Sequence, residues 1–515
     1  MKTVEKRYLG IELGSTRIKA VIIDEKCNVL ATESYNWENK YENGFWTYSQ
    51  SEILYGIQEC CEKTLDKYEY LYNETPNISS IGISAMMHGY IALDENNNLL
   101  VPFRTWRNTN TKKACQELTR LFSFNVPLRW SISFLYQSIL DKEEHINEIK
   151  YLTTLSGYVH YLLTDSKYLG IGDASGMFPI DSSTKNYNQK DIELFNQLLK
   201  KNHINYEIND ILPKILVAGK NAGYLTKKGA NLLDRKHRIK ENTPFCPPEG
   251  DAQTGMVATN SIKRKTGNIS VGTSIFLMVV LDKPLENYYP EIDVVSTPDG
   301  YDAAMLHANN CTTDLNSWMF LMQDCLKAFN VDKSMSELYT TLFLKSKEAD
   351  DDIGGLLNYN YCSAEPISNV DKGLPLFLKE KNNNISIANF MKAQIYSCIA
   401  PISFGIDIFD KEHVVIKDIC GHGGFFSTPS ISANAVSAIL KSPITILENA
   451  SEGGAWGIAI LSSYLNRNES LEEYLDSVFK HINKNTYVAD QKEIKSLDNY
   501  MTRYKDYLYI EQSVK

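Results

Sequence analysis

Two stretches of the chain share one order of residues: an apolar run, a glycine followed by two hydroxyl residues, and a second apolar run. They extend from Gly10 to Ile23 and from Asn268 to Leu281. Apolar runs around a short polar turn predict two strands joined by a tight, glycine-containing turn. The turns are Gly14-Ser15-Thr16 in the first stretch and Gly272-Thr273-Ser274 in the second.

The two stretches align at a constant offset of 258 residues, and each would open one half of the chain. Similarity at a fixed spacing indicates a duplicated structural unit. At 515 residues, the chain is long enough for two large domains. We therefore expect a boundary near residues 256–266, with an N-terminal domain at 1–258 and a C-terminal domain at 259–515.

Strands and helices alternate along the rest of the chain. Residues 52–68 have helical spacing, with Ile53, Leu54, Ile57 and Leu65 on one face. This alternation predicts an α/β fold in which helices pack on a sheet. Further strands are expected at residues 29–32, 81–85, 90–93, 414–416, 419–420 and 444–447, and further helices at 430–440, at 453–465 and on the surface beyond residue 484.

Composition narrows the class of protein. Hydrophobic residues make up 43% and charged residues 23%, which is ordinary for a globular protein. The net charge of −10 disfavours a nucleic acid as partner, and the densest cationic run, Lys263-Arg264-Lys265, is short. No apolar stretch approaches the roughly 18 residues that a membrane span needs. The ten cysteines lack metal-binding spacing and indicate reduced thiols, so we expect a cytoplasmic protein.

The two glycine-hydroxyl turns suit the binding of phosphate groups. Glycine lets a phosphate approach the backbone, and each turn offers N–H groups beside two hydroxyls. Either turn alone also fits an ordinary hairpin, but their recurrence at matching positions favours the phosphate role. Gly423-Gly424, between a predicted strand and a predicted helix, offers a flat support for the adenosine of a nucleotide, although such pairs also serve packing.

Asp251 is the candidate general base. It lies within Pro247–Gly255, a run of turn residues just before the expected domain boundary. A carboxylate there can accept a proton from a hydroxyl as a phosphoryl group arrives. The alternative is that Asp251 caps a helix beginning at Ala252, which is a common role for aspartate. The two roles are compatible.

Seven short motifs occur along the chain in a fixed order. They are Gly10-Ile-Glu-Leu-Gly-Ser-Thr-Arg-Ile-Lys19, Met86-Met-His-Gly89, Thr105-Trp-Arg-Asn108, Asp173-Ala-Ser-Gly176, Gly250-Asp251, Gly272-Thr-Ser274 and Gly421-His-Gly-Gly424. Each is loose, but the ordered set resembles the FGGY family of carbohydrate kinases, most closely its xylulokinase and ribulokinase branches. The resemblance extends from Tyr8 to about Leu465.

The resemblance implies a two-domain, actin-like ATPase fold of the ribonuclease H-like type, with sugar and ATP in a cleft between the domains. It implies that the ATP phosphates lie between Gly14, Ser15 and Thr16 on one side and Gly272, Thr273 and Ser274 on the other. It also implies that Gly423 and Gly424 support the adenosine, that Asp251 is the catalytic base, and that Met87 and His88 contact the sugar. Without the resemblance, His88 would be interpreted as an ordinary packed histidine.

Three positions depart from the family's pattern. Glu12 stands where the family usually has aspartate, which moves the Mg²⁺-associated carboxylate by roughly a bond length. Trp106-Arg107-Asn108 stands where xylulokinases usually have Trp-Asn-Asp, so an amide replaces a carboxylate acceptor for sugar hydroxyls. Asn110 stands where arginine is common. These departures affect the identity of the substrate more than the reaction.

We therefore expect a kinase that transfers the γ-phosphoryl group of MgATP to the terminal hydroxyl of a ketose, most simply the pentuloses D-xylulose or L-ribulose. Asp251 would deprotonate that hydroxyl, and Glu12 would orient Mg²⁺ directly or through water. The sugar site would consist of Met87, His88, Trp106, Asn108 and Asp251.

Two alternatives from other functional classes remain. One is a non-catalytic, ATP-binding sugar sensor of the same fold, which the glutamate at position 12 keeps open. The other is a chaperone or filament protein of that fold, because a fold does not determine function. The oligomeric state is also left open, with a homodimer as one assembly to test.

Overall fold

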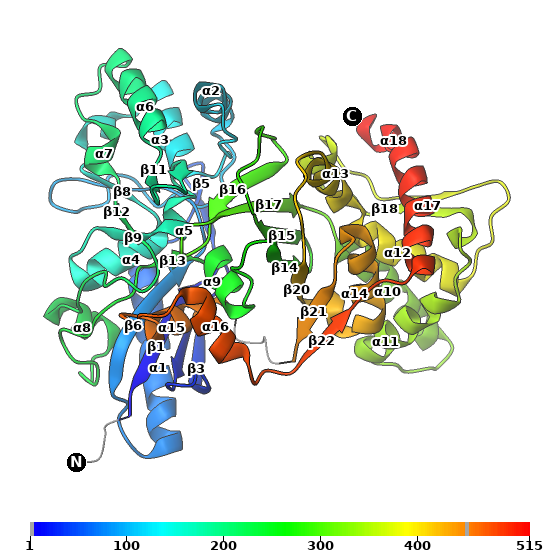
Figure 1. The fold of residues 1–515 in the computed structure, drawn as a ribbon, viewed down its shortest axis with the longest axis horizontal. Coiled ribbons are helices and arrows are strands. Elements are labelled where there is room, and N and C mark those ends of the chain that lie inside the picture. Colours follow the sequence, from blue (N-terminus) through cyan, green and yellow to red (C-terminus); the bar gives the residue numbers. More distant parts are fainter. Residues whose placement is uncertain (1–4, 449–452, 515) are drawn as a thin grey trace. The chain divides into compact units, whose positions relative to one another are not determined.

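The computed structural model describes residues 5–448 and 453–514 (Figure 1). The chain forms two compact units of α/β architecture, which confirms the predicted fold class. The first unit consists of Met1–Ile262, Asp293–Ala303 and Ala450–His481. The second consists of Lys263–Ile292, Ala304–Asn449 and Ile482–Lys515. Each unit therefore contains segments that are distant in sequence.

A five-stranded sheet forms the centre of the first unit. Its strands lie in the order β13-β6-β1-β2-β3. Strand β1 pairs antiparallel with β2 and parallel with β6, so the hairpin predicted around Gly14 is confirmed. The bounds are β1 Arg7–Leu13, β2 Arg17–Ile23, β3 Val29–Asn36, β6 Ile78–Ala85 and β13 Glu249–Gly250.

Two helices cover this sheet. Helix α1 (Gln50–Tyr72) packs on β2 and β3 and buries Ile53, Ile57 and Leu65 of its predicted apolar face, whereas Leu54 is only partly buried. Helix α15 (Gly453–Ser463) packs on β1 and β6 and is almost entirely buried. A Cβ at Gly10 would lie 2.3 Å from the Ala455 carbonyl oxygen, so only glycine lets α15 approach β1 this closely.

The first unit contains further short strands and helices. The strands are β4 Lys40–Glu42, β5 Phe45–Thr47, β7 Ile91–Leu93, β8 Tyr151–Thr153, β9 Tyr168–Gly170, β10 Ile180–Asp181, β11 Asn186–Tyr187 and β12 Lys214–Leu216. The helices are α2 Lys112–Phe122, α3 Ser131–Leu140, α4 Leu155–Thr164, α5 Ile171–Ala174, α6 Gln189–Lys201, α7 Ile208–Ile211, α8 Lys227–Leu233, α9 Asp251–Ala258 and α16 Leu471–Phe479.

The second unit repeats the central motif of the first. Strand β14 pairs antiparallel with β15 and parallel with β20, and β20 pairs parallel with β21. Helix α12, buried from Ala388 to Ile399, packs beside α14, which covers the sheet. The main bounds are β14 Thr266–Val271, β15 Ile275–Val280, β17 Asp302–Ala308, β20 Asp418–His422, β21 Ile444–Leu447, β22 Lys484–Tyr487, α10 Thr312–Ala328, α11 Met335–Lys345, α12 Ile387–Ile399, α13 Ser403–Lys411, α14 Pro429–Leu440 and α17 Gln491–Tyr507.

Strand pairing revises the alignment of the two hairpins. Gly10 pairs with Val21, and the equivalent Asn268 pairs with Met278 rather than with Val279. The offset is therefore 258 residues in the first strand but 257 in the second, and the predicted constant offset is wrong for the second strand. The reason is that four residues separate the paired Leu13 and Ile18, whereas three separate the paired Val271 and Ile275.

Two other predictions need correction. Residues 414–416 form no strand, because they connect α13 to β20 and Val415 is 51% exposed. The helix predicted beyond residue 484 is present as α17, but it is only partly a surface helix, since Leu497, Tyr500 and Tyr504 are buried. In the part of the chain that the structure describes, no helix combines the length and apolar character required to cross a membrane.

Candidate functional site

The carbonyl oxygens of the first glycine-hydroxyl turn are held by aromatic residues. The Trp37 indole N–H donates to the Gly14 carbonyl at 2.7 Å, and the Tyr48 hydroxyl donates to the Ser15 carbonyl at 2.6 Å. The Trp37 amide donates to the Thr16 carbonyl at 3.2 Å. With its carbonyls engaged, the turn has amide and hydroxyl groups with which to bind an anion.

The second turn is held instead by Cys311 and Thr312, at the start of α10. The Cys311 amide donates to the Thr273 carbonyl at 3.1 Å, and the amide and hydroxyl of Thr312 both donate to the Gly272 carbonyl. Thr312 is the first residue of α10. A Cβ at Gly272 would meet nothing within 4 Å, so this turn has open space beside it. In both turns the carbonyl oxygens are engaged, but aromatic side chains bind those of the first turn, whereas residues at the start of α10 bind those of the second.

Gly423 lies against the second turn within the same unit. Its φ is +107°, and a Cβ there would lie 2.4 Å from the Val271 carbonyl oxygen, so the backbone and the packing both require glycine. A Cβ at Gly424, by contrast, would meet nothing within 4 Å. The packing role considered for this pair therefore holds for Gly423, while Gly424 leaves the space that an adenosine would need.

Glu12 is a partly buried carboxylate near the end of β1. It pairs across the hairpin with Lys19, and its Oε2 accepts the Ala455 amide at 3.1 Å. A Cβ at Gly454 would lie 2.2 Å from Glu12 Oε1, so glycine makes room for the longer side chain. Burial raises the pKa of Glu12 to about 7, and the negative charge of Asp251 adds to that rise.

Asp251 is the first residue of α9, and Gly250 is the helix N-cap. The helix thus begins one residue earlier than expected, and the alternative that Asp251 is the capping residue is wrong. Its Oδ1 instead accepts the Met87 amide at 3.1 Å. Burial raises the pKa of Asp251 above its usual range, which makes the carboxylate a better proton acceptor.

Met87 and His88 follow β6 and are both buried. His88 has a φ of +69°, a left-handed conformation that is uncommon outside glycine and that marks a constrained position. Its Nδ1 lies 3.3 Å from the Gly176 carbonyl, so Nδ1 carries the proton and Nε2 is an acceptor. Burial, followed by the charge of Arg129, keeps the pKa of His88 well below its usual range. A buried ring also fits a packed histidine, and the sugar contact stays a prediction.

Trp106 and Asn108 differ in their surroundings. Trp106 is 39% exposed, and its indole N–H donates to the Ser15 hydroxyl at 3.3 Å, beside the first turn. Asn108 is buried, and its amide bonds to the backbone of Trp46 and Thr105. Asn108 therefore fixes the loop that carries Trp106.

The structure brings the predicted residues together in two groups. Glu12, Asp251 and Met87 lie together in the first unit, and Ser15 lies beside Trp106 there. In the second unit, Gly423 lies at the base of the second turn. No group of three or more His, Cys, Asp or Glu side chains suited to a metal ion occurs among the described residues. A divalent ion at Glu12 would relieve its repulsion with Asp251, so the residues fit a metal that takes its other ligands from phosphate or water.

Several residues near the site were not selected from the sequence. Lys19 and Arg17 both lower the pKa of Glu12, although burial outweighs them, and the alternation of β2 could have placed them on one face. Arg129 pairs with Asp293, and Asn125 donates to the same carboxylate at 3.0 Å. No local pattern connects Asp293 with Arg129, because the contact joins residues far apart in sequence.

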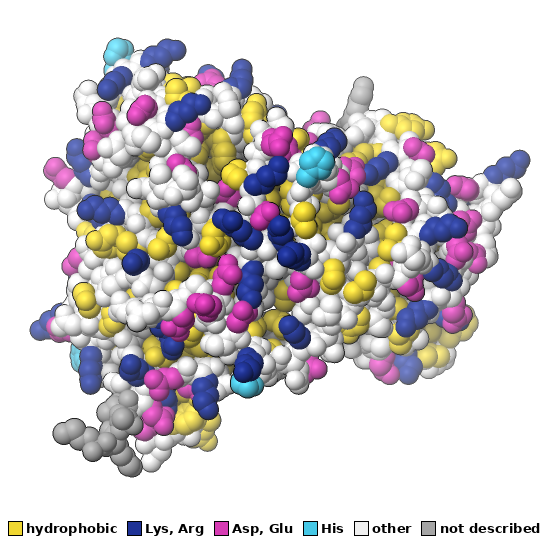
Figure 2. Space-filling model, in the orientation of Figure 1, with side chains coloured by type: hydrophobic (Ala, Val, Ile, Leu, Met, Phe, Trp, Pro, Cys, Tyr) yellow, Lys and Arg dark blue, Asp and Glu magenta, His cyan; other side chains and the backbone are white. Residues whose placement is uncertain are grey.

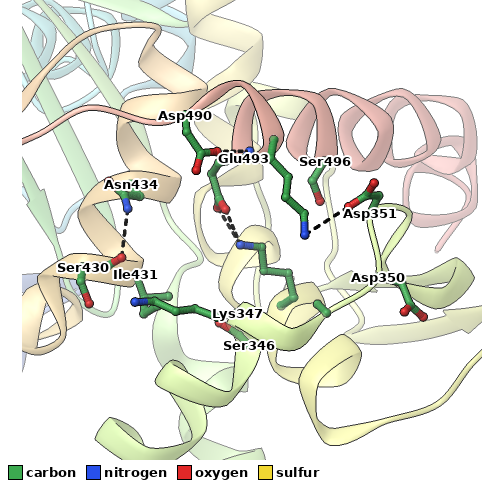
Figure 3. A pocket seen from close by; sticks show the side chains of 13 residues that line it. Ser346, Lys347, Asp350, Asp351, Ser430, Ile431, Asn434, Asp490, Glu493 and Ser496 are labelled. Atoms are coloured by element: carbon green, nitrogen blue, oxygen red, sulfur yellow. Dashed lines mark hydrogen bonds and ion pairs between the residues drawn. The ribbon is translucent and has the colours of Figure 1, made fainter.

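A separate cavity of about 320 Å³ lies in the second unit between α14, α17 and the segment that follows α11 (Figure 3). Four of its charged residues form two ion pairs, Lys392 with Glu493 and Lys492 with Asp351. None of the residues predicted for the site lines this cavity. On the face shown in Figure 2, cationic and anionic side chains are interspersed. We therefore assign no ligand to the cavity or to that face.

Comparison with protein families gives two matches that together span most of the chain. The profile of the N-terminal domain of the FGGY family of carbohydrate kinases matches residues 7–258. The profile of the C-terminal domain of that family matches residues 267–465.

Individual relatives support these matches. A xylulose kinase from Haemophilus influenzae is 23% identical over 532 residues, which cover 97% of this chain and 98% of the relative. A gluconokinase from Bacillus subtilis is 24% identical over 289 residues, covering 54% of this chain and 52% of that protein.

Solved structures share the fold. The ligand-bound xylulose kinase from Lactobacillus acidophilus has a TM-score of 0.79 at 17% identity and is covered to 99%, as is this chain. The glycerol kinase from Plasmodium falciparum, solved with ADP, has a TM-score of 0.74 at 14% identity, and 98% of each chain is covered.

Proposed function

Because the chain belongs to the FGGY family of carbohydrate kinases, and is thus a phosphotransferase, we propose that it transfers the γ-phosphoryl group of ATP to the terminal hydroxyl of a ketose. The substrate would be a pentulose, D-xylulose or L-ribulose, and the products a sugar 5-phosphate and ADP. The observation that carries the proposal is the pairing of Asp251 with the Met87 amide, beside Glu12. This pairing joins a partly buried base to the segment that contains two of the predicted sugar contacts, Met87 and His88.

Asp251 acts as the base in this proposal. Its Oδ1 is held by the Met87 amide, so the carboxylate is oriented before the sugar binds. Such orientation contributes to catalysis because no rearrangement is needed as the hydroxyl loses its proton. Glu12 would hold Mg²⁺, directly or through water, and the ion would neutralise charge on the transferring phosphoryl group. Lys19, opposite Glu12 on the hairpin, adds positive charge on the same side.

The two turns hold the nucleotide. Ser15 and Thr16, supplied by residues 1–258, would bind phosphate through their amides and hydroxyls, beside Gly14, whose own amide donates to the Arg17 carbonyl. Thr273 and Ser274, supplied by residues 259–515, would bind it in the same way beside Gly272, whose amide donates to the Ser274 carbonyl, with Gly423 and Gly424 next to the adenosine. Support comes from the matching bonding of the turns, whose carbonyls are engaged in both cases.

Charge near His88 favours a neutral sugar over an aldonate. The Gly89 amide donates to the Arg129 carbonyl at 3.2 Å, and the Arg129 guanidinium pairs with Asp293. This pair has no net charge, whereas recognition of a carboxylate such as that of gluconate requires an available cation.

The test is ADP release with MgATP on a panel of D-xylulose, L-ribulose, other ketoses, gluconate and glycerol. Stimulation by one pentulose well above the other compounds, with the sugar 5-phosphate as product, is the expected result. Stimulation by gluconate alone would contradict the ketose assignment. Binding of ATP with no sugar-stimulated turnover would favour the sensor alternative. The expected cytoplasmic location and homodimer stay predictions, which cell fractionation and light scattering check.

A further inference from the structure

Two buried carboxyl groups of the first unit have no part in the chemistry proposed so far. Glu249 lies on β13, two residues before Asp251, and Asp173 lies in α5. Each is only 1% exposed. Burying carboxyl groups is costly unless hydrogen bonds replace those to water. Their surroundings therefore need a physical explanation.

Glu249 joins β13 to α5 through its side chain. Its Oε2 accepts the Asp173 amide at 2.8 Å, and its Oε1 lies 3.4 Å from the Gly172 nitrogen. A Cβ at Gly170 would lie 2.3 Å from Oε1, and one at Gly172 would lie 2.5 Å from Oε2. Glycine is therefore required at both positions, because any side chain there would collide with the Glu249 carboxylate. We call this contact of Glu249 with Gly170, Gly172 and the Asp173 amide the cradle.

Asp173 connects Glu249 to the segment that contacts His88. Its Oδ2 accepts the Thr154 hydroxyl at 2.6 Å and also the Ser156 hydroxyl, while Oδ1 has no partner in the described structure. Three residues later, the Gly176 carbonyl lies 3.3 Å from His88 Nδ1. Burial raises the pKa of Asp173 to about 7, and repulsion by Asp251 contributes.

Gly176 packs closely against Met87 and His88. A Cβ there would lie 2.7 Å from His88 Nδ1 and 2.9 Å from Met87 Cε. Three hydrogen bonds and the chain between them form a closed ring. Asp251 accepts the Met87 amide, the neighbouring His88 bonds to the Gly176 carbonyl, and Asp173, three residues before Gly176, donates its amide to Glu249. Glu249 lies two residues before Asp251, which completes the ring. A displacement at one point of such a ring is transmitted to the others.

We propose that Glu249 and Asp173 are positioning residues that hold the base Asp251 in register with the sugar-contact segment at Met87 and His88. The inference rests on the proposed role of Asp251. Neither carboxyl touches the substrate. They act by tying β13, which leads into Asp251, to the segment that supports His88.

Glu249→Gln tests the proposal with little change in size. The amide introduces a donor that faces the backbone amides of Gly172 and Asp173, so the cradle contact is lost on one side. Misplacement of a reacting group by about 1 Å can lower turnover by about 10²-fold. We expect kcat to fall by roughly that factor and the KM for the sugar to rise, while the KM for MgATP stays unchanged because the turns are untouched. The matched control is Asp191→Asn, another buried carboxyl of this unit, in α6 and outside the ring; it should leave kcat and both KM values unchanged.

A second readout does not depend on turnover. The Met87 amide donates to Asp251, so its hydrogen exchange reports whether the base is in place. Exchange in a peptide covering residues 85–90 should accelerate in Glu249→Gln and not in Asp191→Asn. If Glu249→Gln does not fold, Asp173→Asn takes its place, with the same pattern expected and a smaller loss of kcat.

Equal effects of Glu249→Gln and Asp191→Asn on kcat and on exchange would overturn the positioning role. If the wild-type enzyme phosphorylates no ketose, the ketose proposal fails separately. The kcat comparison is then made with the sugar that it does phosphorylate, and the exchange comparison stands unchanged.

Discussion

The two glycine-hydroxyl hairpins have the same strand pairing but different surroundings. In the first, a tryptophan and a tyrosine hold the turn, whereas in the second the residues at the start of α10 do so. Glu12 lies before the first turn, and its equivalent before the second turn is Ser270. Only the first hairpin therefore combines phosphate-binding groups with a carboxylate. The duplicated turns therefore need not share one task, because Glu12 and Asp251, the residues proposed to hold the metal and to act as the base, both lie in the first unit.

Glu12→Gln should have the largest effect among changes to the hairpins, with Ser270→Ala as the matched change in the second. Loss of a carboxylate that orients the metal, directly or through water, costs about 10–100-fold in activity. We expect that loss in kcat/KM for MgATP in Glu12→Gln, and little change in Ser270→Ala. Steady-state kinetics over a range of Mg²⁺ concentrations provide the measurement. Similar losses in both variants would mean that the hairpins share one role.

The activity should depend on pH through Glu12, the carboxyl group that only the first of the two hairpins carries before its turn. Since the pKa of Glu12 is about 7, its carboxylate is protonated as pH falls below 7. We expect kcat/KM for MgATP to fall by about tenfold per pH unit there. In Glu12→Gln this dependence should be absent, and a pH profile identical to that of the wild type would contradict the assignment.

Stability should respond to pH in the opposite direction. The pKa of Glu12 in the folded protein lies above the ordinary glutamate value of 4.5, which applies to the unfolded chain. Its contribution to stability is therefore present at low pH and is lost as pH rises through about 7. Without nucleotide or metal, the melting temperature of the wild type should fall relative to that of Glu12→Gln between pH 5 and 8. Calorimetry of the two proteins across this range checks the sign.

Thr273→Val should weaken nucleotide binding without removing catalysis. The hydroxyl is predicted to bind a phosphate oxygen, and a hydrogen bond to a charged group contributes about 1.5–3 kcal/mol. The KM for MgATP should rise by about tenfold or more, while the KM for the sugar stays the same. An unchanged KM for MgATP would remove the second turn from the nucleotide site.

Tyr48→Phe should produce the smallest effect. It deletes the hydroxyl that holds the Ser15 carbonyl, leaving that acceptor without its partner at a cost of about 1 kcal/mol. We expect a rise of about fivefold in the KM for MgATP. The control is Tyr158→Phe, which removes a hydroxyl bonded to Gln50 elsewhere in the unit. Equal responses would show that the Tyr48 bond does not shape the turn.

The sequence predicted the features that depend on neighbouring residues. The hairpins, the face of α1 and the strand at 444–447 follow from short-range periodicity, and the structure confirms them. The strand expected at 414–416 failed because three apolar residues also fit a connection between elements. The family resemblance pointed to Asp251, but its bond to the Met87 amide could not be seen in the sequence.

Contacts between distant residues could not be predicted at all. Trp37 holds Gly14, Arg129 pairs with Asp293, and Glu249 accepts the amide of Asp173. Each contact depends on how the chain folds back on itself, which periodicity does not report. The loop role of Asn108 belongs to the same class, because its amide is engaged by Trp46.

The turnover of Asp251→Asn, measured with the sugar that the wild type phosphorylates, tests most directly whether Asp251 is the base. Asparagine retains an oxygen that can accept the Met87 amide but cannot take up a proton as the carboxylate does. We expect a loss of kcat of about 10²–10⁴-fold, with binding of the sugar and of MgATP retained in calorimetry. A kcat within a few-fold of the wild type would show that Asp251 is not the base.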